Sequence, residues 1–158
     1  MVRFRHLAAV TTGLTFALIL LGVYTAAMGA GLSCSAQWPF CDGGLIPQTF
    51  PSFVEWFHRL IAMITGFFIL GTAIGSWKYT GEKRIRGAAT LALAVTPIQV
   101  VLGGATVFIY TPIVQVAHHT AALIIFGALL ATTLWSYEAE RTPDARGADS
   151  TTGYPSDD

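Results

Sequence analysis

Residues 55–77 read EWFHRLIAMITGFFILGTAIGSW and join three ionisable side chains to a long apolar run. Glu55, His58 and Arg59 stand at its start, and no other charged residue follows before Lys78. A helix needs roughly 20 apolar residues to cross a hydrocarbon core of about 30 Å. This stretch therefore predicts a membrane-spanning helix with a group of ionisable residues near one end.

Three further apolar stretches, at residues 8–28, 88–110 and 114–136, have a similar length and character. The 158-residue chain is 53% hydrophobic and only 11% charged, whereas soluble domains carry about 25% charged residues. We predict an all-α membrane protein, with one four-transmembrane-helix domain over residues 1–137. The formal net charge is zero and no basic stripe is present, so we expect a membrane lipid environment and no nucleic-acid partner.

Positive charge predicts how the chain is oriented. Lysine and arginine gather at both termini and between the second and third stretches, whereas the loop 29–54 has neither. By the positive-inside rule, both termini are expected to be cytoplasmic in a multi-pass cell-membrane protein, with the loop 29–54 outside. The tail 138–158 is acidic and nearly without apolar residues, so we expect it to be disordered.

Two histidines fall near the outer ends of the second and fourth predicted helices, His58 and His118. Ionisable groups within a membrane span are costly and usually face the bundle interior with a partner. Their similar depth predicts that they share a metal or a heme, although a hydrogen-bonded structural role is the alternative for each. Zinc is disfavoured because it needs further ligands at that depth, and only Glu55 is available.

A short internal repeat relates the two halves of the chain. Residues 58–62 and 118–122 both follow the pattern H-x-x-x-A, and residues 21–25 and 102–106 both follow L-G-x-x-T. The order of these matches indicates a bundle made of two duplicated helical hairpins. A pseudo-twofold bundle of this kind would present one histidine from each copy across its axis.

Glu55 and Arg59 flank His58 on the second helix. Glu55 lies three residues before His58 and so shares its helical face. It is either a carboxylate that complements the helix dipole or, beside a bound heme, a group that accepts protons. For Arg59 two contacts are open, one with lipid headgroups and one with a heme propionate.

The outer loop holds the only two cysteines of the chain, Cys34 and Cys41. Their spacing lacks the C-x-x-C of thiol oxidoreductases, and their place on the oxidising side favours a disulfide that closes a small loop. We favour a structural disulfide over a redox-active one. Trp38, Phe40 and Leu45 suit a segment on the membrane surface, where it could cover the site.

Four motifs together resemble one family. They are GLSCSAQWPFCDGGLIP at 31–47, EWFHR at 55–59, QVVLGGATV at 99–107 and VQVAHHTAALIIFG at 114–127. Their order resembles the heme A synthases, and the resemblance covers residues 8–136. It implies an oxidoreductase that converts the C8 methyl of heme O to a formyl group, giving heme A for terminal oxidases. Heme O synthase and terminal oxidase assembly would then be its partners.

By the same resemblance, His58 and His118 match the axial ligands of the heme iron. Glu55 matches the catalytic carboxylate, and Cys34 and Cys41 match the loop disulfide. Full-length members have eight helices and a second histidine pair that holds heme b. We therefore expect a homo-oligomer or another subunit to supply the electron-accepting half. Iron with two histidine ligands has no open position for dioxygen, so water is the expected oxygen source.

Two other functions fit parts of this sequence. A four-helix b-type cytochrome that only transfers electrons would need the same histidines, but neither Glu55 nor the outer loop. A quinone-linked protein that generates disulfides would need a reactive cysteine pair, but no paired histidines within the membrane.

Overall fold

The computed structural model of the chain describes residues 2–34, 37–38, 41 and 47–141. Four long α-helices are present: α1 (Val2–Ala27), α2 (Phe50–Tyr79), α3 (Lys83–Phe108) and α4 (Pro112–Arg141). A single 3-10 turn, η1 (Ala30–Leu32), follows α1. Each α-helix is long and apolar enough to cross a membrane, so the predicted all-α, four-helix class is confirmed.

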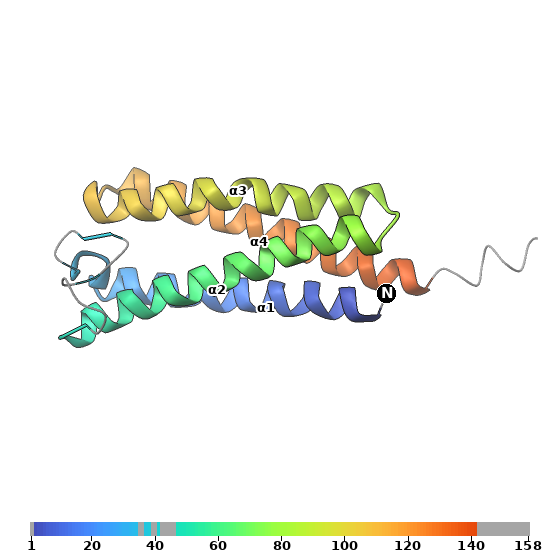
Figure 1. The fold of residues 1–158 in the computed structure, drawn as a ribbon. Coiled ribbons are helices and arrows are strands. Elements are labelled where there is room, and N and C mark those ends of the chain that lie inside the picture. The colour runs from blue at the N-terminus through green and yellow to red at the C-terminus, as the bar shows by residue number, and fades with distance from the viewer. Residues whose placement is uncertain (1, 35–36, 39–40, 42–46, 142–158) are drawn as a thin grey trace, which may run out of the picture.

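The four helices form two antiparallel hairpins, α1–α2 and α3–α4 (Figure 1). Within the bundle, α1 packs against α2 and α4, and α3 packs against α4 and α2. The N-terminus, the α2–α3 turn and the end of α4 lie at one end, which we call the terminal end (Figure 1). The opposite end, the loop end, carries η1 and the α3–α4 turn. From the α2–α3 turn toward the loop end, α2 diverges from α3.

The start of α2 differs from the expected one because its first turn is well capped. Thr49 is the N-cap, and its Oγ1 accepts a hydrogen bond from the backbone N–H of Ser52 at 3.3 Å. Pro51 stands in the first turn, where its missing N–H costs nothing. The helix therefore begins five residues before Glu55, and this carboxylate lies inside the helix rather than at its N-terminus.

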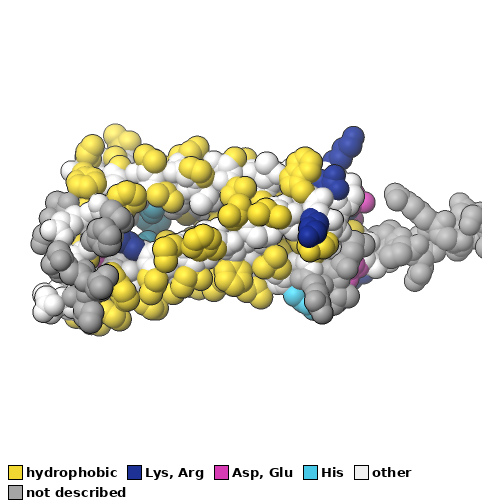
Figure 2. Space-filling model, in the orientation of Figure 1, with side chains coloured by type: hydrophobic (Ala, Val, Ile, Leu, Met, Phe, Trp, Pro, Cys, Tyr) yellow, Lys and Arg dark blue, Asp and Glu magenta, His cyan; other side chains and the backbone are white. Residues whose placement is uncertain are grey.

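Large apolar side chains cover the outside of the bundle over most of its length (Figure 2). Phe67 on α2 is 66% exposed and Val101 on α3 is 71% exposed. The buried apolar core is correspondingly small, and its centre is formed by Ile69, Ala92, Ile125, Ala128 and Leu129. Such an apolar exterior suits contact with lipid tails, where exposure of these side chains carries no hydrophobic penalty.

Threonine hydroxyls join the helices inside this apolar layer. Thr11 of α1 and Thr72 of α2 share a buried hydrogen bond of 2.8 Å between their hydroxyl oxygens. Thr12 of α1 and Thr133 of α4 share one of 2.9 Å. Hydrogen bonds of this kind stabilise helix pairs in membranes by about 0.6 kcal/mol on average, so α1 is fixed to both of its neighbours.

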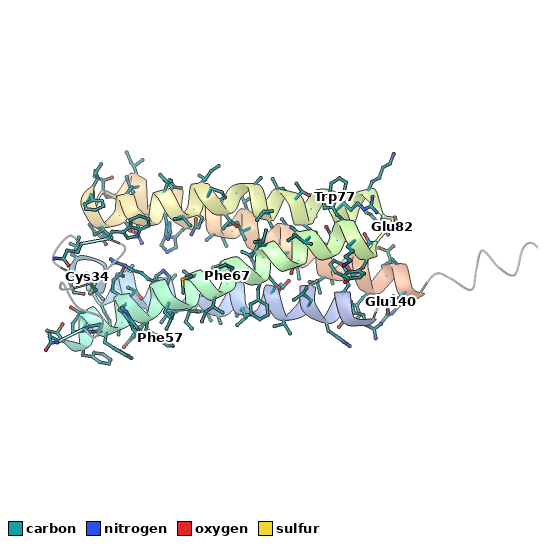
Figure 3. The ribbon with its side chains drawn as sticks, viewed as in Figure 1. Cys34, Phe57, Phe67, Trp77, Glu82 and Glu140 are labelled. Atoms are coloured by element: carbon teal, nitrogen blue, oxygen red, sulfur yellow. A yellow bond between two sulfur atoms is a disulfide. The ribbon has the colours of Figure 1, made fainter. Side chains whose placement is uncertain are left out.

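The end of α4 corrects one predicted boundary. The helix runs to Arg141, whereas we expected the disordered tail to start at residue 138. Two ion pairs hold this last turn, one between Arg84 and Glu138 at 3.1 Å and one between Arg5 and Glu140. Figure 3 shows Glu140, Glu82 and Trp77 at the terminal end of the bundle. The rest of the predicted tail, residues 142–158, lies outside the described residues.

Candidate functional site

His58 projects from α2 onto a glycine of α1. A methyl group placed on the Cα of Gly22 would lie 3.0 Å from Cε1 of His58 and 3.7 Å from both ring nitrogens. That first distance is tighter than nine in ten real contacts of a Cβ atom, so a larger residue at position 22 would require the ring to shift by a few tenths of an ångström. The imidazole thus packs directly on the α1 backbone.

His118 repeats this arrangement in the second hairpin. A methyl group on Gly103 of α3 would lie 3.2 Å from Cε1 of His118 and 3.8 Å from its Nδ1. Gln99, one turn before Gly103, also contacts the ring, and its Nε2 lies 3.3 Å from Nε2 of His118. In this pair the amide nitrogen of Gln99 is the donor and Nε2 of His118 is the acceptor.

The two imidazoles face a shared space. The rings of His58, His118 and His119 lie within electrostatic range of one another. Figure 2 shows histidine side chains at the bottom of a hollow in the loop-end half of the bundle, where α2 has diverged from α3. The structure therefore brings together His58 and His118 from different hairpins.

Both rings carry a buried nitrogen that lacks a partner. Nδ1 of His58 and Nδ1 of His118 are buried without a hydrogen bond to any described residue, and so are Oε1 of Gln99 and Oγ1 of Thr65. Thr65 lies about two turns along α2 from His58 and so shares its face. An unpaired buried polar atom costs about 1–3 kcal/mol, so these atoms mark a place where a polar or metal-containing ligand would be stabilised.

His119 has a separate role at this end of α4. Its Nδ1 donates to the carbonyl oxygen of Gln115 at 2.8 Å. Its ring meets that of His118 edge to face, with 6.0 Å between centroids. His119 is therefore bonded to the backbone of its own helix.

Glu55 forms an ion pair one turn closer to the loop. Its Oε1 accepts a hydrogen bond of 2.8 Å from Nε of Arg59, and both side chains are largely buried. Nη1 of Arg59 also donates to the carbonyl oxygen of Gln37 at 3.0 Å. Arg59 thus joins the carboxylate to the outer loop, a contact that neither sequence interpretation of Arg59 had included.

The outer loop is fixed to α2 beside this ion pair. Cys34 and Cys41 form the predicted disulfide and are both almost completely buried. Ser52, in the first turn of α2, donates its hydroxyl to the carbonyl oxygen of Ser33 at 3.1 Å. Figure 3 shows Cys34 at the loop end of the bundle.

Trp38 extends the loop across to α3. A methyl group on Gly104 would lie 3.6 Å from its indole ring, so the two are in ordinary contact. The loop therefore reaches both helices that diverge at this end. Phe40 and Leu45, which we expected on the membrane surface with Trp38, lie outside the described residues.

A cavity of about 140 Å³ lies at the opposite, terminal end of the bundle. It is lined by Phe4, Thr80, Gly81, Glu82, Ile85, Ser136, Ala139 and Glu140. None of the predicted site residues lines it. We therefore assign the candidate site to the histidine hollow, which holds the buried Nδ1 atoms of His58 and His118.

Two contacts of this site could have been found in the sequence. Gln99 belongs to the motif QVVLGGATV and stands four residues before Gly103, which places both on one helical face. Glu55 and Arg59 have the spacing i, i+4 that favours an ion pair on a helix. The contacts of the loop with Gly104 and Arg59 have no such signal, because they join residues far apart in the chain.

The fold and site together define a class: a four-helix, multi-pass membrane protein with one histidine from each hairpin directed into a shared hollow. Comparison with known proteins identifies the family. The family model COX15-CtaA, described as cytochrome oxidase assembly protein, matches residues 48–153. The chain belongs to this family, as its resemblance to the heme A synthases had indicated.

Curated relatives carry two different names. The chain is 31% identical over 139 residues to a heme A synthase of Bacillus licheniformis. The aligned region covers 86% of this chain and 46% of the relative. A heme A synthase of Bacillus cereus is 31% identical over 153 residues, which are 92% of this chain and 49% of the relative. A protoheme IX farnesyltransferase of Halobacterium salinarum is 36% identical over 137 residues, which are 85% of this chain and 29% of the relative. The chain thus spans about half the length of these heme A synthases, and less of the farnesyltransferase.

The ion pair at Glu55 leads to a stability prediction. Arg59→Met is expected to lower the free energy of unfolding by about 3 kcal/mol, because it leaves a largely buried carboxylate without its cation. Combining it with Glu55→Gln should recover part of this loss. Denaturant unfolding of the purified chain in detergent measures both effects.

Arg84→Met is the control, since the side chain of Arg84 is 42% exposed. Exposed ion pairs contribute about 1 kcal/mol or less. A loss for Arg59→Met no larger than that for Arg84→Met would show that the Glu55–Arg59 pair does not stabilise the fold.

Proposed function

We propose that this protein is a heme A synthase that oxidises the C8 methyl of heme O to a formyl group. His58 and His118 hold the iron of the substrate between the two hairpins, and Glu55 accepts protons during the oxidation. The family membership and the relatives named heme A synthase support this proposal.

The observation that carries the proposal is the paired placement of His58 and His118. Each imidazole comes from the second helix of a hairpin and packs on a glycine of the first helix. Each also has a buried Nδ1 without a hydrogen bond to the described residues. Two such rings facing one space supply the two nitrogen ligands that a hexacoordinate heme iron takes.

Other atoms of the hollow suit a porphyrin substrate. Oε1 of Gln99 and Oγ1 of Thr65 are buried polar groups that could hydrogen-bond to an oxygenated ring substituent. A bound substrate would also require the Gln99 amide to leave Nε2 of His118, if this nitrogen is the one that binds iron. The opening between α2 and α3 gives the hollow access to the apolar exterior.

The oxidation balances with water as the oxygen donor. A methyl group and one water molecule give a formyl group, four protons and four electrons. Glu55 is the nearest carboxylate on the helical face of His58, and Arg59 holds it in a fixed position. We propose that Glu55 accepts protons there and passes them to the outer side.

The farnesyltransferase relative supports heme O as the substrate. Farnesyl transfer to protoheme IX is the step that makes heme O, and part of a protein with this name is 36% identical to the chain. We propose that the chain acts next to a heme O synthase and supplies terminal oxidase assembly. We also propose a cell-membrane location with cytoplasmic termini, which the lysines and arginines at the terminal end support.

Pigment analysis tests the function. Expressed in a host that makes heme O, the chain should yield heme A or its alcohol intermediate in extracted membranes. Glu55→Gln should retain bound heme but lose this conversion, because the amide cannot accept a proton. Heme B alone would identify an electron-transferring cytochrome, and wild-type heme A from Glu55→Gln would remove Glu55 from the chemistry.

Absorption spectra test the two ligands. His58→Ala and His118→Ala should each abolish the low-spin bis-histidine spectrum of the bound heme. His119→Ala should retain it, because His119 is committed to the Gln115 carbonyl. A low-spin spectrum that survives both ligand substitutions would rule out the assignment.

We propose a homodimer as the source of the electron acceptor. One chain has a single described histidine pair, which the substrate occupies, and a twofold assembly supplies a second pair by symmetry. Crosslinking in native membranes should give a dimer, and heme counting should give bound heme on both chains. A monomer that still makes heme A would contradict the dimer and require an external acceptor.

A further inference from the structure

We propose that Gly22 and Gly103 are positioning residues that set the place of the two imidazoles, and hence their geometry as iron ligands. The heme that the two histidines would bind comes from the proposed function, on which this proposal rests. The role of the two glycines goes beyond that function. We call Gly22 and Gly103 the site glycines.

The contacts of the site glycines are specific to the histidines. In both cases the closest neighbour of the missing methyl is Cε1 of the ring, at 3.0 Å from the Gly22 position and 3.2 Å from the Gly103 position. Cε1 is bonded to both ring nitrogens, so any displacement of this atom moves the nitrogen that would bind iron. A methyl group at either glycine would therefore tilt or shift the ring away from its helix.

Most other described glycines lack such a contact. A methyl group on Gly13 of α1 or Gly87 of α3 would meet nothing within 4 Å. At Gly75 a methyl group would meet Phe4, at the terminal end of the bundle. At the loop end, Trp38 comes only to an ordinary contact distance of 3.6 Å from the Gly104 position, so the tighter contacts of 3.0 and 3.2 Å belong, among the described residues, to the two histidines of the candidate site.

The two hairpins repeat this arrangement independently. Gly22 lies in the first helix of its hairpin and His58 in the second, and Gly103 and His118 have the same relation. The sequences between the two members of each pair differ greatly in length, because only the first hairpin contains the outer loop. What the two hairpins share is therefore the contact between glycine and histidine. Such a shared contact is expected if His58 and His118 must stand at a fixed distance from each other.

Histidine NMR signals of the heme-free protein give the first measurement. The chain has four histidines, so the ring Cε1–H signals of ¹³C-histidine-labelled protein can be assigned by single His→Ala variants. Gly22→Ala should shift the signal of His58 and leave that of His118, and Gly103→Ala should do the reverse. Gly13→Ala and Gly87→Ala, in the same two helices, are the matched controls and should shift neither.

Ferric protoporphyrin IX gives the second measurement, and it does not depend on conversion of heme O. Ligand-orienting neighbours change metal affinity by about 10–100-fold, so each site-glycine variant should bind the porphyrin at least about tenfold more weakly and show a high-spin component. The control variants should keep the wild-type affinity and low-spin spectrum.

A double-mutant cycle separates positioning from general packing. In a His58→Ala background, Gly22→Ala should affect thermal stability no more than Gly13→Ala does, because the ring that it would displace is gone. An effect of Gly22→Ala that persists in this background would overturn the proposed role of Gly22.

The outcomes distinguish this proposal from the proposed function. Site-glycine variants whose histidine signals and porphyrin spectra match those of the controls would overturn the positioning role, even with ligation intact. Shifted histidine signals with an unchanged porphyrin spectrum would also overturn it. By contrast, the low-spin spectrum could persist in both His58→Ala and His118→Ala. This result would refute iron ligation by the two histidines, and with it the positioning of iron ligands by the site glycines.

Discussion

A polar side chain within a hydrocarbon layer has no water to bond to, and this constraint governs the whole bundle. Backbone amides are satisfied inside each helix, and the threonines at Thr11, Thr12, Thr72 and Thr133 pair with one another across helix contacts. Ion pairs gather at the two ends. Against this background, the ring nitrogens of His58 and His118 are buried without a hydrogen bond to the described residues, as are side-chain oxygens of Gln99 and Thr65. Under the proposed function, a bound ligand would stabilise them.

The two hairpins are alike in packing and different in polarity. Each places a histidine on a glycine of the preceding helix. Four residues before Gly103 stands Gln99, whose amide reaches His118, whereas four residues before Gly22 stands Leu18. A substrate held between the rings would therefore meet an amide on one side only. Under the proposed function, this asymmetry would favour one orientation of the porphyrin between the rings.

The outer loop compensates for the divergence of α2 from α3 at the loop end. Arg59 and Ser52 fix it to α2, and Trp38 packs on α3 at Gly104. Gly103 and Gly104 are consecutive, so their open faces point in different directions around α3. One accommodates the ring of His118 and the other the indole of Trp38, so neighbouring residues of α3 hold the histidine and the outer loop.

The sequence by itself determined the four helices, their membrane character and the disulfide between Cys34 and Cys41. These features depend on local composition, on length and on a single pair of cysteines, so they can be recognised without knowing which segments meet. The repeat also indicated that His58 and His118 would belong to equivalent hairpins. Helix ends were less certain, because the Thr49 cap of α2 and the ion pairs of Glu138 and Glu140 extend the helices beyond their apolar runs.

Only the tertiary structure decided how the site is assembled. The contact of His58 with Gly22, the amide of Gln99 on His118 and the path of Arg59 to the Gln37 carbonyl all join residues on different elements. Their distances depend on how far the helices approach and how they are rotated, which periodicity along one helix does not specify. Glycine at positions 22 and 103 let each imidazole lie close to the backbone of a neighbouring helix, and this packing fixed where the ring stands.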